Sequence, residues 1–139
     1  MDRYQDWSVR LNKFITDHHT QGFEYGKHDC CLYVCDAVLA MTGVDMAEDF
    51  RGYDEKSFEK LLKDNKGVGG IAIQMAKKLN LHKIPVSFAQ RGDVVYLKDS
   101  EEQSVLGIVS MNGRDVYVAT NIGVTEYPLV HCNHAWRIG

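Results

Sequence analysis

The sequence has no long apolar run and no excess of positive charge. No segment approaches the roughly 18 consecutive apolar residues that a membrane-spanning helix needs, so we do not expect an integral membrane protein or a membrane partner. Its 16 lysines and arginines are outnumbered by 19 aspartates and glutamates, which gives a net charge of −3 and no basis for general nucleic-acid binding. The first seven residues are polar and lack the apolar core of a signal peptide. These absences predict a protein made in a reducing cytoplasm.

The chain also lacks internal repeats, low-complexity tracts and linker-like segments. Its 139 residues are enough for one domain and too few for two ordinary ones. Hydrophobic residues make up 45% and charged residues 25%, which is an average globular composition and argues against disorder. We therefore expect a single domain over residues 1–139.

The pattern of apolar residues predicts helices over residues 1–82. Trp7, Leu11, Phe14 and Ile15 fall on one face of a first helix, for which Asp6 is a plausible N-cap. The segment 30–42 is apolar almost all round, which is typical of a buried helix.

Gly43 follows this segment, where a helix-ending glycine is expected. The charge of Asp36 inside the same segment must either face outward or pair with an arginine. Two further helices are expected, from about residue 54 to 67 and from about residue 70 to 79.

Residues 86–139 have the short apolar runs of strands. Asn112-Gly113 is a strong hairpin signal, and Asn121-Ile122-Gly123 is a second tight turn. The expected strands are 93–97, 105–111, 115–120 and 124–129, with 135–138 closing the sheet. Helices first and an antiparallel sheet of about five strands second predict an α+β fold with the helices packed on the sheet.

Cys30 is the residue most suited to chemistry. Asp29 is a good N-cap, which places Cys30 in the first turn of the buried helix, where free backbone N–H groups and the helix dipole favour a thiolate. The negative charge of Asp29 opposes this effect. The alternative is that Cys30, Cys31 and Cys35 are all small apolar core residues.

Three short motifs carry a resemblance to a known family. Asp29-Cys30-x-x-Tyr33-Val34 resembles the nucleophile motif of the NlpC-like cysteine peptidases, which share the papain fold. Phe23-x-Tyr25-Gly26 is similar to an aromatic-glycine element upstream of that cysteine, and the segment 91–96 (Arg-Gly-Asp-Val-Val-Tyr) to a strand that follows the helices. The resemblance implies a papain-like, NlpC-like fold with Cys30 as the candidate nucleophile.

A closer resemblance extends over almost the whole chain, to a family of small phage and prophage proteins encoded near tail genes. It rests on Trp7, segments 28–31, 41–45, 51–52, 91–95 and 106–109, and the ending Ala135-Trp136-Arg137-Ile138-Gly139. It implies a virion or tail-assembly context, with phage tail proteins as partners. The protein would be made in the cytoplasm of a bacterial host and could end in the virion tail.

The resemblance also implies that catalytic groups have been lost. The histidine that serves as the base in NlpC-like peptidases falls on Val105, which cannot accept a proton. A tyrosine thought to help the oxyanion falls on Phe23, which has no hydroxyl. For the third, orienting residue, only Thr120 and Asn121 are polar candidates. The first hypothesis is therefore a tail-associated structural or assembly component with a degenerate cysteine-hydrolase site.

Two alternatives stay open. The protein could be an active cysteine peptidase or amidase on peptidoglycan peptides of the bacterial cell wall, with Cys30 as nucleophile and a non-standard base such as His131 or His134. It could also be a zinc-bound structural module with ligands drawn from Cys31, Cys35, His131, Cys132 and His134, although these spacings match no common zinc motif. The favoured reading has no cofactor and no metal, and the oligomeric state is left open.

Overall fold

The computed structural model describes residues 1–20, 22–24, 26 and 28–139. Its elements in chain order are α1 (Trp7–His18), α2 (Cys30–Thr42), α3 (Glu55–Asp64), α4 (Val68–Lys78), β1 (Lys83–Ile84), the 3₁₀ turn η1 (Val86–Phe88), β2 (Val94–Lys98), β3 (Ser104–Val109), β4 (Asp115–Thr120), β5 (Gly123–Pro128), the 3₁₀ turn η2 (Leu129–His131) and β6 (His134–Trp136). No helix among these residues is long and apolar enough to cross a membrane. The α+β class expected from the sequence is confirmed.

The strands form one antiparallel sheet in the order β1-β6-β2-β3-β4-β5. Strands β2 to β5 follow one another as hairpins, and β6 returns to the free edge of β2. Gly113 and Gly123 have φ angles of 74° and 109°, which suits their expected places in the tight turns. The five strands expected from residue 86 onward are present as β2 to β6, and the sheet has one further strand that was not expected. Strand β1 precedes that boundary, and its two residues are too short for an alternating pattern.

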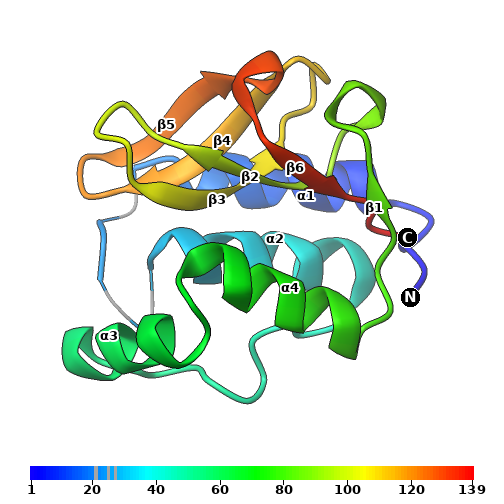
Figure 1. Ribbon diagram of the computed structural model, residues 1–139. Helices are drawn as coiled ribbons and strands as arrows, with labels where there is room; N and C mark the ends of the chain where they lie inside the picture. The colour runs from blue at the N-terminus through cyan, green and yellow to red at the C-terminus, as the bar shows by residue number, and fades with distance from the viewer. Residues whose placement is uncertain (21, 25, 27) are drawn as a thin grey trace.

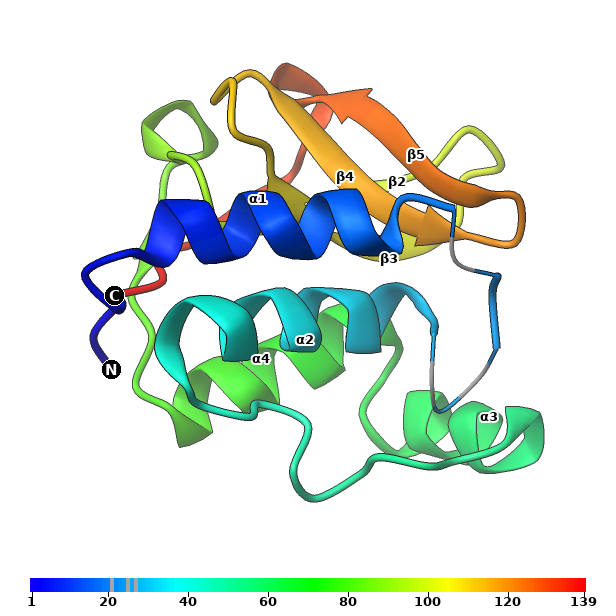
Figure 2. The ribbon, with the colours of Figure 1, turned by 180° about the vertical axis from the view of Figure 1, so that it is seen from behind.

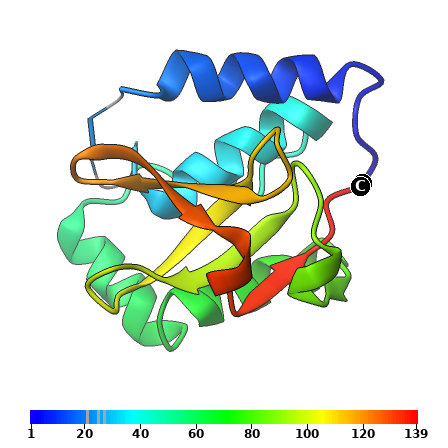
Figure 3. The same ribbon diagram turned by 90° about the horizontal axis from the view of Figure 1, so that it is seen from above.

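Helices α2 and α4 lie against one side of the sheet, and α1 runs alongside α2 (Figures 1 and 2). Seen from above, α1 lies at one margin of the molecule, with α2 between it and the centre of the sheet (Figure 3). The two ends of the chain lie next to each other (Figures 1 and 2). Because α2 occupies the middle of this arrangement, its N-terminal end is surrounded by several elements.

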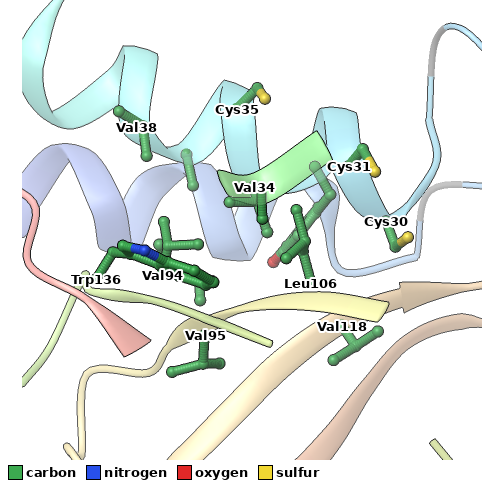
Figure 4. Packing of buried hydrophobic residues seen from close by; sticks show 14 of the residues in the cluster. Cys30, Cys31, Val34, Cys35, Val38, Val94, Val95, Leu106, Val118 and Trp136 are labelled. Atoms are coloured by element: carbon green, nitrogen blue, oxygen red, sulfur yellow. The ribbon is translucent and has the colours of Figure 1, made fainter. Parts of the chain in front are cut away.

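Helix α2 is a buried helix, as its composition predicts. Ten of its residues are buried, and Leu106 of β3 points from the sheet toward it (Figure 4). Gly43 ends the helix in the left-handed conformation and donates its N–H to Leu39, as expected. Of the two arrangements expected for Asp36, the structure shows the pairing with an arginine: its Oδ1 lies 2.7 Å from the guanidinium of Arg51.

Asp6 was expected to cap α1 with its side chain, and this expectation was wrong. Asp6 occupies the N-cap position, but its side chain accepts no capping hydrogen bond from the helix. The carboxylate instead forms an ion pair with Arg10 at 2.8 Å, one helical turn further along. An i,i+4 partner of opposite charge therefore competes with the free backbone N–H groups for this side chain.

Asp93 is a fully buried carboxylate that joins both ends of the chain to β2. It pairs with Arg3 at 3.0 Å and Arg137 at 3.1 Å. It also accepts the backbone N–H groups of Gln90 and Ile138. Because these four donors satisfy both oxygens, the cost of burying the charge is offset by paired, hydrogen-bonded geometry.

We predict that Asp93→Ala destabilises the protein by about 3 kcal/mol, because it leaves two arginines facing a site without their counter-ion. Urea unfolding followed by circular dichroism measures this. The matched control is Asp17→Ala, which removes an exposed aspartate paired with Lys13 and should cost under about 0.5 kcal/mol. Equal losses for the two variants would show that Asp93 has no special role.

Candidate functional site

A cleft of about 810 Å³ opens above the N-terminal end of α2. It is lined by residues from α3, the start of α4, the beginning of β3 and the β4–β5 turn, with Cys30 and Asp29 among them. The sequence places Cys30 here because the Asp29 cap starts the helix one residue before it. The later turns of α2 are packed in the hydrophobic core. Cys30, in the first turn, is therefore the residue of α2 that borders the cleft.

Asp29 holds the entrance to α2 through both carboxylate oxygens. One oxygen accepts the backbone N–H of Leu32 at 2.9 Å, which is the expected cap. The other accepts the N–H of Gly26 at 3.0 Å and the hydroxyl of Tyr53. The carboxylate raises the pKa of Tyr53, together with the larger effect of burial. The cap therefore also joins two loops to the start of the helix.

The surroundings of the Cys30 sulfur act on its pKa in opposite directions. A hydrogen bond from the Cys31 thiol lowers the pKa of Cys30, burial raises it, and a backbone hydrogen bond from Leu106 of β3 lowers it again. The charge of Asp29 raises it, as expected from the sequence, and the net result is a pKa below the ordinary thiol value. Only 8% of the residue is exposed. Cys30 is therefore a thiol with a lowered pKa and narrow access.

The structure brings the sequence-expected positions to this cleft. Phe23, Val105, Thr120 and Asn121 all line it together with Cys30. Val105 begins the inner part of β3 opposite Leu97 and is 8% exposed. Tyr25, part of the upstream motif, lies outside the described residues. Val105, at the position where the resemblance expects a base, therefore lines the same cleft as Cys30 and has an aliphatic side chain.

The histidines lie elsewhere. None of the described residues that line the cleft is a histidine. His134 lines a different hollow with Trp136, and His131 is exposed in η2, so neither meets the expectation that it could reach Cys30. The other four are placed as follows: His18 stacks on Phe14 with ring centroids 4.3 Å apart, His28 borders the same small hollow as His18, His82 borders a hollow near the termini, and His19 is exposed.

The zinc hypothesis gains no support from the geometry. Within the described part of the chain, no group of three or more histidine, cysteine, aspartate or glutamate side chains is placed to hold a metal ion. Cys35 contacts the sulfur of Met75 at 3.8 Å in the core. Cys31 donates to Cys30, and this bond and burial raise the Cys31 pKa well above the ordinary value. These two cysteines therefore behave as protonated core thiols.

Sequence reasoning missed several residues of the site. Tyr53 stands in a loop 24 residues beyond Asp29, and no local pattern connects the two. The Leu106 N–H belongs to the backbone, so its role depends on where β3 packs. Carboxylates outnumber lysines among the described residues of the cleft, with Asp29, Glu55, Glu59, Asp99 and Glu101 against Lys66. The cleft therefore favours basic groups over acidic ones.

The arrangement can stabilise a thiolate but offers no imidazole to take or return a proton. A cysteine hydrolase needs a base within about 3.2 Å of the proton that it moves. The groups that set the Cys30 pKa are Cys31, Leu106, Asp29 and burial, and no histidine is among them.

We predict that Cys31→Ala raises the pKa of Cys30, because it removes the donor that lowers this pKa most. At a fixed pH below the pKa, less thiolate is then present and alkylation is slower. The measurement is the iodoacetamide rate at Cys30 across pH, followed by peptide mass spectrometry. Cys35→Ala is the matched control and should leave the midpoint in place, whereas an unchanged or lower midpoint in Cys31→Ala would refute the assignment.

The comparison with known proteins gives a family without an assigned function. Residues 2–138 match the model described as a domain of unknown function, DUF6950. No curated protein matches the chain. Because the matched segment is nearly the whole chain, the chain belongs to the DUF6950 family.

Proposed function

We propose that this protein is a non-catalytic relative of NlpC-like cysteine peptidases that works as a structural or assembly component of a phage tail. The single observation behind the loss of catalysis is Val105. It lines the cleft of Cys30 at the position where the resemblance expects the base, and it cannot move a proton. The placement of Phe23 at the same cleft adds to this, since it lacks the expected hydroxyl.

The papain-like assignment is supported by topology and by convergence. The helix led by Cys30 packs against an antiparallel sheet, and four positions taken from separate motifs, Phe23, Val105, Thr120 and Asn121, border one cleft with Cys30. Residues far apart in sequence converge in this way when a site has been inherited with its fold. The tail setting rests on the whole-chain resemblance to phage and prophage proteins alone.

The remaining cleft suits a binding role. Its volume of about 810 Å³ is within the range of small-ligand and peptide sites, and its lining is rich in carboxylates. A basic segment of a tail protein is the partner that this charge favours. In such a role the Cys30 sulfur is a packing group at the floor of the cleft.

We predict that Cys30→Ser in the encoding phage or prophage leaves the yield of infectious particles within about twofold of wild type. A hydrolase would instead lose several orders of magnitude in rate with its nucleophile. The destabilised Asp93→Ala variant is the positive control and should lower the yield. A collapse of the yield with Cys30→Ser, while the purified variant keeps its unfolding midpoint, would refute a non-catalytic role.

The tail setting has a separate test. Affinity-tagged protein should co-purify with phage tail proteins during assembly, and particles that lack it should be defective in their tails. Recovery of intact, infectious particles after deletion of the gene would refute a structural role.

An active cysteine peptidase or amidase is the second candidate, and the lowered pKa of Cys30 beneath an open cleft favours it. Its test is the release of new amino groups from purified peptidoglycan, in which one water is consumed for each amide bond broken. The non-catalytic proposal predicts the same signal for the wild type and Cys30→Ala. Release that disappears in Cys30→Ala would establish the hydrolase.

A further inference from the structure

A second hollow, of about 610 Å³, lies between α4 and the β1-β6-β2 end of the sheet. Gly69 and Tyr96 border both this hollow and the Cys30 cleft, and the other described residues that line it do not line that cleft. The hollow is therefore lined mostly by residues that do not line the Cys30 cleft. A ligand of the hollow would bind whether or not Cys30 is catalytic.

The sheet wall of the hollow is aromatic. Tyr96 on β2 is paired with His134 on β6, and Lys83 on β1 is paired with Trp136 on β6. Paired residues and residues two apart share a face, so these four side chains lie on one surface. The ring centroids of Tyr96 and His134 are 5.6 Å apart, and those of His134 and Trp136 are 6.3 Å apart. The ring planes are inclined by 44° and 42° in these two pairs, and Trp136 is 6% exposed, so the wall is aromatic but not flat.

The helix wall of the hollow has two small residues, Gly69 and Ala76. Gly69, Ile73, Ala76 and Lys77 of α4 line the hollow at helical spacing. A Cβ atom at Gly69 would lie 3.3 Å from the Tyr96 ring, so a larger side chain there would narrow the space. Ile73 is 47% exposed, which leaves an apolar side chain facing solvent at this wall.

The charged groups at the hollow have one sign. Lys77 and Lys83 line it, and no carboxylate does so among the described lining residues, although the chain as a whole carries a net charge of −3. Burial and the charge of Lys83 both lower the pKa of His134, which disfavours the protonated form of the ring beside this lysine. An anionic group is what this local excess of positive charge would bind.

We propose that this hollow binds a small planar aromatic anion, with its ring against Tyr96 and Trp136 and its charge near Lys77 and Lys83. The class covers aromatic carboxylates, sulfonates and phosphates. Both parts of the recognition are needed, because the rings alone would accept neutral aromatics and the lysines alone would accept any anion.

The experiment uses a matched pair of fluorescent probes. The anionic probe is 8-anilinonaphthalene-1-sulfonate, and the neutral one is N-phenyl-1-naphthylamine, which lacks the sulfonate. We expect the sulfonate to bind at one site about tenfold more tightly than the neutral probe. Lys77→Gln and Lys83→Gln should each weaken it about fivefold and leave the neutral probe unaffected. Lys98→Gln, a strand lysine outside the hollow, is the control for net charge.

The site is located by the indole N–H signals of the two tryptophans in an ¹⁵N-resolved NMR spectrum. The Trp136 signal should move on addition of the sulfonate and the Trp7 signal should stay, with Trp7→Phe used for assignment. The proposal is overturned if the sulfonate fails to bind, if it binds no better than the neutral probe, if the Lys98→Gln control weakens it as much as Lys83→Gln, or if the Trp136 signal does not move.

Discussion

The arrangement of the Cys30 cleft depends on one carboxylate. Asp29 starts α2 by capping Leu32 and at the same time holds Gly26 and Tyr53. Gly26 has a φ of 79°, and a Cβ atom there would lie 1.9 Å from the Tyr53 carbonyl oxygen, so the approach of these two loops requires glycine. These contacts of Asp29 fix the start of α2, and so they fix Cys30 in the first turn of the helix.

The position of Cys30 in the first turn of α2 exposes its thiol to opposing effects on the pKa. Two hydrogen-bond donors and the backbone of the first helical turn favour the thiolate, whereas burial and the Asp29 charge favour the thiol. Nucleophilic catalysis needs more than a lowered pKa, because the leaving group must receive a proton and the attacking thiol must lose one. Val105 and Phe23 line the cleft, and neither side chain can take or donate a proton. Under the proposed function, this is the physical basis of a binding role for the cleft.

Local sequence patterns were sufficient to predict a helix or a turn where the residues concerned strongly prefer one backbone conformation. The apolar segment 30–42 with Asp29 and Gly43 at its ends predicted α2 without error. Asn112-Gly113 predicted the hairpin of β3 and β4, in which Gly113 takes a positive φ and Asn112 does not. The strand β1 was missed because two residues carry no period, and the Asp6 cap failed because Arg10 competes for its carboxylate. Tyr53, the Leu106 N–H and the aromatic hollow come from tertiary packing between segments distant in sequence, which no single-segment pattern contains.

The central claim is that no histidine is coupled to Cys30. The most direct measurement is the NMR titration of all six imidazoles before and after alkylation of Cys30. The account predicts the same six pKa values in both states, because the groups that act on the sulfur are Cys31, Leu106 and Asp29. A histidine whose pKa shifts by about one unit or more when Cys30 is alkylated would be its base, and the non-catalytic account would then be contradicted.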